Sequence, residues 1–175
     1  AGGVGSLLCQ WAHHIGAHVI GTAGSEEKAA IARKNGCDDV IRYTQESFPE
    51  RVHALTQGRG VDVAYDGVGK DTFFGSLASL AMRGHLINFG QSSGAVEPFL
   101  VSRLVQKSNT LSRPILFHYI EDPRERQEMA DVAFEALRKG VIRVEVGAEF
   151  ALEDVADAHR ALESRRTTGS TILVP

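Results

Sequence analysis

The sequence predicts an α/β protein built on a doubly wound parallel sheet. Short apolar runs alternate with amphipathic segments of helical period between residues 1 and 113. Because strands that are joined through helices run parallel with right-handed crossovers, this alternation favours one parallel sheet with helices on both faces. A glycine cluster stands directly before the first helix, where the first strand of such a sheet would end. We therefore expect a sheet whose first strand lies upstream of Ala1.

The individual elements follow from periodicity and from helix end signals. The first helix ends at Gly16, and the second begins at Ser25 and ends at Gly36. Further helices are expected over residues 48–55, 74–81, 99–107, 122–139 and 153–164. Strands are expected over residues 18–22, 39–43, 61–65, 84–89, 110–113, 142–146 and 170–174. After Pro114 the strand–helix rhythm is lost, so the tail is expected to belong to another domain.

Composition and charge narrow the functional classes. The chain has 175 residues, 43% of them hydrophobic, and its net charge of −3 gives no field that would attract nucleic acid or an anionic membrane. No apolar run approaches the roughly 20 residues of a membrane-spanning helix. Cys9 and Cys37 are far apart and form no CxxC pair, so we expect free buried thiols in a reducing cytoplasm, and no cluster has metal-ligand spacing. Because Ala1 is not a start methionine, a removed targeting segment stays an open alternative.

The glycine cluster Ala1–Gly5 predicts a dinucleotide site. At the start of a helix, glycines let backbone N–H groups approach a pyrophosphate, and the helix dipole adds positive charge. In the Rossmann fingerprint G-x-G-x-x-G, Gly2 takes the third position and Gly5 the sixth, while Gly3 is an additional glycine. A glycine cluster can also form a plain turn, but the strands and helices around this one favour a Rossmann-type dinucleotide-binding domain.

The turn after the first strand of the chain indicates which nucleotide binds. In this fold an acidic residue there bonds the adenosine ribose and repels a 2′-phosphate, and here no acid occupies the turn. Ser25 can donate a hydrogen bond, Lys28 supplies a positive charge, and Tyr43 is a second donor on the same sheet edge. A solvated lysine and a half-buried strand tyrosine are the plain alternatives. Glu26 and Glu27 also stay open as ribose ligands, but the balance predicts NADPH rather than NADH.

Two other classes that use a glycine loop fit less well. A methyltransferase also usually has an acid at the end of the second strand of its sheet, and none is present. Short-chain dehydrogenases need Tyr-x-x-x-Lys as proton donor, and no tyrosine of this chain has a lysine four residues on.

Several motifs follow one another along essentially the whole chain. They are Ala1–Gly5, Cys9–Ala12, Gly16–Thr22, Tyr65–Gly69, Phe89–Gly94, Ser112–Pro114, Glu163–Arg165, Thr168–Ser170 and the final Pro175. Together they resemble the zinc-independent, zeta-crystallin-like NADPH:quinone oxidoreductases of the medium-chain dehydrogenase/reductase superfamily. The resemblance implies an NADPH-binding Rossmann domain over residues 1–116, without its first strand, and a return segment of the GroES-like substrate domain over residues 117–175. The N-terminal substrate domain of that family is absent from the chain.

The resemblance also implies roles for particular residues. The pyrophosphate would be held by Gly2, Gly3, Val4 and Gly5, and the 2′-phosphate by Lys28 and Tyr43, beside the Ser25 hydroxyl, with Arg165 as a further phosphate ligand. The ribose would be lined by Asp66, Val68 and Gly69, and the nicotinamide side by Phe89, Gln91 and Ser92. These residues follow strands, and the carboxyl ends of strands are where open α/β sheets bind ligands.

The implied chemistry is hydride transfer from NADPH to a quinone or a similar conjugated carbonyl. No catalytic residue is assigned, because a reduced quinone can take its proton from solvent. The activity of this polypeptide alone stays open, and an enal or enone reductase or a non-catalytic NADPH-binding protein are the alternatives. In the resembled family the last strand of this sheet pairs with its two-fold mate, so we expect a homodimer through residues 109–113. The alternative is a monomer whose edge is shielded by the helix over residues 118–139.

Overall fold

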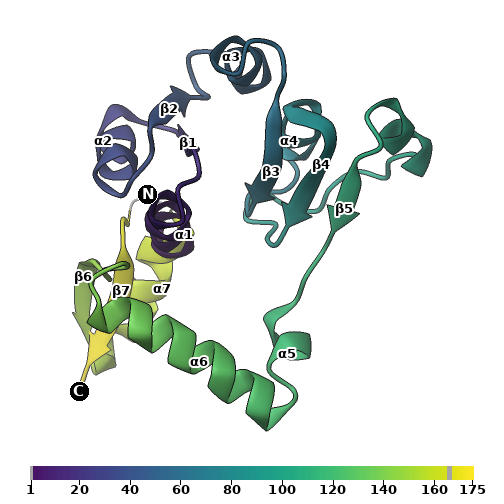
Figure 1. Cartoon of the computed structure of the whole chain (residues 1–175). Coiled ribbons are helices and arrows are strands. Elements are labelled where there is room, and N and C mark those ends of the chain that lie inside the picture. Colours follow the sequence, from purple (N-terminus) through teal and green to yellow (C-terminus); the bar gives the residue numbers. More distant parts are fainter. Residues whose placement is uncertain (1, 165–166) are drawn as a thin grey trace. The chain divides into compact units, whose positions relative to one another are not determined.

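The computed structural model describes residues 2–164 and 167–175 and divides the chain into two compact units. The first unit combines Ala1–Gln45 with Ala130–Pro175, and the second is Glu46–Met129. Figure 1 shows the helices and strands of both units, and each unit is treated by itself below. The predicted boundary after residue 116 concerns the domains of a whole protein, and it stays a prediction.

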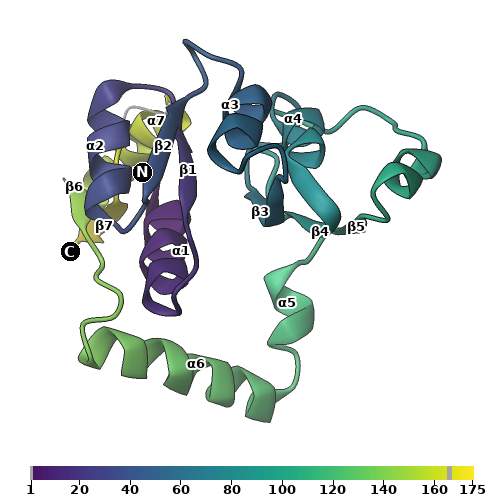
Figure 2. The same ribbon diagram turned by 45° about the horizontal axis from the view of Figure 1, so that its top comes forward.

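The N-terminal part of the first unit alternates helix and strand as expected. It contains α1 (Gly3–His14), β1 (Ile20–Ala23), α2 (Glu26–Lys34) and β2 (Asp39–Arg42). The two strands are parallel and lie side by side in Figure 1 and Figure 2, with Ile20 opposite Asp39. Gly16 and Gly36 adopt left-handed backbone angles, φ 83° and 95°, just after the two helices, which confirms both predicted helix ends.

The C-terminal part of the first unit is a second parallel strand–helix–strand motif. It contains the end of α6 (Pro123–Arg138), then β6 (Val146–Ala151), η2 (Leu152–Asp154), α7 (Val155–Glu163) and β7 (Ser170–Val174). β6 pairs in parallel with β7. The predicted strand over residues 142–146 is wrong, because the backbone of Arg143 is bonded to a side chain of α1 instead of to a neighbouring strand.

The second unit is built around a three-stranded parallel sheet with the order β3-β4-β5. Its elements are α3 (Phe48–Leu55), β3 (Val61–Asp66), α4 (Phe73–Ala78), β4 (Leu80–Asn88), η1 (Val101–Gln106), β5 (Thr110–Ser112), α5 (Leu116–Tyr119) and the start of α6. Phe73, Leu80 and Leu86 form its buried core.

The helix predicted over residues 74–81 is three residues too long at its C-terminal end. It ends at Ala78, and β4 already begins at Leu80, whose side chain is fully buried and which pairs with Val61. Gly60 allows this close connection, because its φ is +85° and a Cβ at that position would lie 2.6–2.7 Å from backbone atoms of Ser79 and Leu80.

The described strands pair only in parallel, as the sequence predicts, but they form three sheets instead of one. Within the described residues, β1 is paired on one side by β2, and β3 is paired on one side by β4. Each unit therefore contains a strand with one unpaired edge.

Candidate cofactor-binding site

The glycine loop forms the N-terminus of α1. Gly2 is the N-cap residue in an extended conformation, no side chain caps the helix, and the first turn contains no acidic residue. The first N–H groups of a helix have no intrahelical partner, so in the described part of the chain this end presents donors and partial positive charge with no side-chain cap. A Cβ on Gly2 or Gly5 would meet nothing within 4 Å, so open space lies beside the loop. The loop has the chemistry of an anion site.

The turn between β1 and α2 brings three predicted residues together. Ser25 caps α2 through its hydroxyl, which accepts the Lys28 N–H at 3.3 Å. The Tyr43 hydroxyl reaches the same turn from the end of β2, because a Cβ on Gly24 would lie only 2.7 Å from the Tyr43 oxygen. Gly24 is thus the residue that makes room for the tyrosine. The Ser25 hydroxyl and the Tyr43 phenol therefore lie at one turn in which no acid is present, and Lys28 stands in the first turn of the helix that follows.

The carboxylate of Glu26 is engaged inside the same unit. It forms ion pairs with Arg33 at 3.0 Å and with Arg42 at 3.2 Å. Two arginines therefore hold the first-turn acid that was an alternative ribose ligand. Glu27, the other first-turn acid, is exposed.

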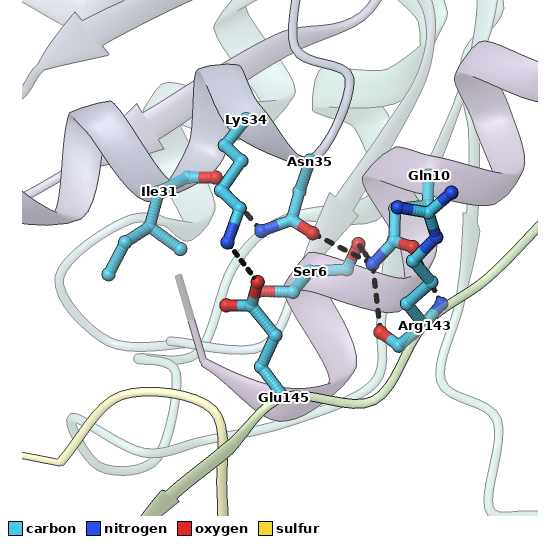
Figure 3. Close-up of polar contacts among 7 residues, drawn as sticks. All are labelled: Ser6, Gln10, Ile31, Lys34, Asn35, Arg143 and Glu145. Carbon is cyan, nitrogen blue, oxygen red and sulfur yellow. Dashed lines mark hydrogen bonds and ion pairs between the residues drawn. The ribbon is translucent and has the colours of Figure 1, made fainter.

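The segment that leads into β6 is tied to α1 and α2. The Gln10 side chain accepts a hydrogen bond from the Arg143 N–H at 2.7 Å and donates to the Arg143 carbonyl at 3.2 Å and to Asn35 at 2.8 Å (Figure 3). Lys34 forms an ion pair with Glu145 (Figure 3). The amide of Gln10 therefore bonds both the N–H and the carbonyl of Arg143, which a neighbouring strand would otherwise bond.

The same return segment reaches the glycine loop. Gly2 and Gly169 form a parallel β-bridge, and a Cβ on Gly3 would lie 3.7 Å from the Ser170 hydroxyl. The start of β7 thus lies beside the start of α1. Arg165, the predicted phosphate ligand of this segment, lies outside the described residues.

In the second unit, Asp66 organises the turn after β3. Its side chain is 3% exposed, and its carboxylate accepts hydrogen bonds from the N–H groups of Val68 (2.8 Å) and Gly69 (3.0 Å). The hydroxyls of Thr72 and Ser76 also donate to it, at 2.8 Å and 3.1 Å. Both oxygens are therefore used within the chain. Asp66 shapes the loop beside which a ribose is predicted.

The loops after β3 and β4 interlock. A Cβ on Gly67 would lie 2.8 Å from the Phe89 ring, and the Ser93 hydroxyl donates to the Val68 carbonyl at 2.8 Å. The Ser92 N–H donates to the Gly67 carbonyl at 3.3 Å. Phe89 is half-buried, whereas Gln91 and Ser92 are exposed.

The predicted site residues thus fall into two groups. The first unit holds Gly2, Gly3, Val4, Gly5, Ser25, Lys28 and Tyr43, and the second holds Asp66, Val68, Gly69, Phe89, Gln91 and Ser92. Each group converges locally at strand carboxyl ends or at a helix start. Their cofactor-binding roles stay predictions.

Several residues that shape the site escape sequence reasoning. Asn88, the last residue of β4, is 3% exposed and donates to the carbonyls of Asp66 and Gly90. Gln10 holds the segment before β6 through hydrogen bonds to the backbone of Arg143. The sequence could have indicated Asn88, because it is a polar residue at the carboxyl end of an otherwise largely apolar strand. Nothing local marks Gln10, because its partner is 133 residues away in the chain.

The described residues 2–164 and 167–175 contain neither a metal-ligand cluster nor a membrane-spanning helix. Among the described residues, no three His, Cys, Asp or Glu side chains lie close enough to hold a metal ion. None of the helices in the same part of the chain is long and apolar enough to cross a membrane.

The fold and the glycine loop define a dinucleotide-binding half of a dehydrogenase. Residues 3–135 match the family described as zinc-binding dehydrogenase, and the chain belongs to this family, within the medium-chain dehydrogenase/reductase superfamily.

Particular relatives are similar over the whole chain. The quinone oxidoreductase of Pseudomonas aeruginosa is 46% identical across 100% of the chain and 54% of the relative, and the 2-haloacrylate reductase of Burkholderia sp is 42% identical across 100% and 53%. The crystal structure of Escherichia coli quinone oxidoreductase complexed with NADPH matches with a TM-score of 0.95 at 44% identity, over 100% of this chain and 55% of that one. The chain therefore spans about half the length of these relatives.

Proposed function

We propose that the protein to which this chain belongs reduces quinones by hydride transfer from NADPH, and that this chain holds the cofactor. The observation that carries the proposal is the acid-free turn after β1, where the Ser25 and Tyr43 hydroxyls lie and which Lys28 follows in the first turn of α2. A 2′-phosphate there would meet two hydroxyls and a cation, while one of the two first-turn carboxylates, that of Glu26, is paired with arginines. The similarity to a quinone oxidoreductase that was crystallised with NADPH supports the same choice.

Different parts of the chain would bind different parts of the cofactor. The start of α1 would bind the pyrophosphate through backbone N–H groups. The interlocked loops that Asp66 and Ser93 hold would line the ribose and nicotinamide. NADPH supplies the hydride, and the protein supplies position and electrostatics. We assign no catalytic side chain, no metal and no zinc to this chain.

The cofactor choice is tested by titrating the full chain with NADPH and NADH. Lys28→Ala should weaken NADPH about tenfold, or 1.4 kcal/mol, because a half-exposed lysine loses one charge-assisted phosphate contact, and it should leave NADH unchanged. Lys34→Ala is the matched control on the same helix, since Lys34 pairs with Glu145. Equal affinity for both cofactors in the parent chain would refute the assignment.

The substrate is tested with the whole protein. A panel of quinones and enones, with NADPH oxidation as the readout, separates quinone reduction from the second candidate, reduction of an activated carbon–carbon double bond. The similarity to a 2-haloacrylate reductase favours including that second candidate. If neither kind of substrate is turned over, a non-catalytic NADPH-binding protein is the remaining proposal.

We also propose a homodimer through residues 109–113. β5 pairs with β4 on one side, and within the described residues no strand pairs with its other side. An open strand edge is a liability unless it is paired or covered, and two-fold pairing closes it. Light scattering at micromolar concentration should give the mass of a dimer; the mass of a monomer would refute the proposal. The cytoplasm as the location of the protein stays a prediction.

A further inference from the structure

The two cysteines of the chain lie against each other although 28 residues separate them. The Cys37 thiol donates a hydrogen bond to the Cys9 sulfur, with 3.3 Å between the two sulfur atoms, and neither is in a disulfide. Cys9 lies on α1, and Cys37 stands between α2 and β2. Both residues belong to the first unit. Both cysteines are free, as the sequence predicts, and the fold brings the two thiols into contact.

The backbone around the pair is arranged for this close approach. Gly36, with φ +95°, brings its chain so near to α1 that a Cβ there would lie 3.3 Å from the Cys9 carbonyl oxygen and 2.8 Å from the Cβ of His13. A Cβ on Gly21 would lie 2.7 Å from the Cys37 sulfur. Glycines at positions 21 and 36 thus provide the room in which the two thiols meet.

The two thiols are not equivalent. Cys37 is 7% exposed, whereas Cys9 is half-buried. The hydrogen bond that Cys37 donates lowers the pKa of Cys9 to about 7, although burial opposes the shift. The same bond and burial raise the pKa of Cys37. The geometry therefore favours Cys9 as the thiolate of the pair and Cys37 as the thiol that donates a hydrogen bond to it.

A recess at the surface of the first unit reaches Cys37. A surface recess of about 640 Å³ has Cys37 among its lining residues, together with the exposed His13, Arg33 and Lys34. The recess is lined wholly by residues of the first unit. A small oxidant in this recess would meet Cys37, whose sulfur lies 3.3 Å from that of the half-buried Cys9.

We propose that Cys9 and Cys37 form a dithiol redox site that reacts with hydroperoxides. The Cys9 thiolate attacks the terminal peroxide oxygen, the O–O bond breaks, and the leaving alkoxide takes a proton to become an alcohol. Cys9 is then a sulfenic acid. The Cys37 sulfur attacks the Cys9 sulfur, the S–O bond breaks, and the departing hydroxide leaves as water with the Cys37 thiol proton. In total two thiols and one hydroperoxide give one disulfide, one alcohol and one water.

The test uses the reduced full chain and hydrogen peroxide as the probe. Trypsin cleaves after Lys28 and Lys34, so Cys9 and Cys37 fall in different peptides. Without reduction, mass spectrometry should find these two peptides joined, with the mass of two hydrogens lost, and dithiothreitol should separate them again. This result does not depend on cofactor binding, so it stands or falls independently of the proposed function.

Two variants test the assigned roles. Cys37→Ser should stop at a Cys9 sulfenic acid that dimedone traps, and Cys9→Ser should leave Cys37 reduced, with a rate of oxidation at least tenfold below that of the parent chain. The proposal is overturned if peroxide leaves both thiols of the parent chain open to iodoacetamide, or takes each to a separate sulfinic acid. Rapid oxidation of Cys9→Ser would overturn the assignment of Cys9 as the nucleophile. If a variant does not fold, the parent peptide map decides alone.

Discussion

The largest single effect that the structure predicts is the loss of the Asp66 carboxylate. Asp66→Ala removes an acceptor on which four donors converge, and these donors hold the turn between β3 and α4. Asp66→Asn keeps one acceptor oxygen in place. Because the side chain is 3% exposed, water cannot simply replace the carboxylate.

The magnitude follows from the environment of each donor. The hydrogen bond from the Gly69 N–H is buried, so leaving this donor unsatisfied costs about 2–3 kcal/mol. The hydrogen bonds of Val68, Thr72 and Ser76 are partly buried, and their loss adds about 0.5 kcal/mol each because water reaches them. Asp66→Ala should therefore cost about 4 kcal/mol of unfolding free energy. Asp66→Asn should cost about 1 kcal/mol, since it loses one oxygen acceptor.

Urea unfolding of the full chain, followed by circular dichroism, measures these costs. With an m-value of about 2 kcal/mol/M, the midpoint should fall by about 2 M for Asp66→Ala and about 0.5 M for Asp66→Asn. The exposed Asp71 on the same loop is the matched control, and Asp71→Ala should leave the midpoint unchanged.

Two results would refute this reasoning. One is an Asp66→Ala midpoint equal to that of Asp71→Ala, which would mean that the four hydrogen bonds contribute nothing. The other is an Asp66→Asn variant as unstable as Asp66→Ala, which would mean that the negative charge, and not the acceptor geometry, stabilises the loop.

Three further substitutions probe other contacts. Gln10→Ala should lower the unfolding free energy by about 1–2 kcal/mol, because it removes two hydrogen bonds to the backbone of Arg143. Gly24→Ala should cost about 1 kcal/mol, because the new Cβ would meet the Tyr43 hydroxyl at 2.7 Å. Gly60→Ala should cost about 3–4 kcal/mol, because positive φ strain adds to a collision with backbone atoms. Urea or thermal unfolding measures all three.

Matched controls separate the causes. Gly58→Ala has nearly the same φ, +83°, but its Cβ would meet nothing within 4 Å, so it should cost only about 1 kcal/mol. In a Tyr43→Phe background, Gly24→Ala should cost less, because the oxygen at 2.7 Å is gone and the ring carbon at 3.2 Å becomes the nearest atom. Equal costs for Gly58→Ala and Gly60→Ala would contradict the collision argument. An undiminished cost of Gly24→Ala in the phenylalanine background would contradict the tyrosine contact.

The sequence alone determined most of the local structure. Gly16 follows the end of α1 and Gly36 the end of α2, Ser25 caps the start of α2, and the glycine loop forms the start of α1, all as predicted. These features depend on residues within one helical turn, so their physical cause is contained in a short stretch of sequence. The parallel pairing of the strands also follows from the order of the elements.

Tertiary structure decided what distant residues do to one another. Residues 142–146 do not form the predicted strand, because the Gln10 side chain is hydrogen-bonded to the backbone of Arg143. The periodicity of the sequence cannot indicate a partner that lies 133 residues away in the chain. The helix after Thr72 ends early because Leu80 is drawn into the core beside Val61. The Asp66 hydrogen bonds and the contact between Cys9 and Cys37 likewise exist only after folding. Local pattern sets backbone conformation, but side-chain partners depend on which segments the fold packs together.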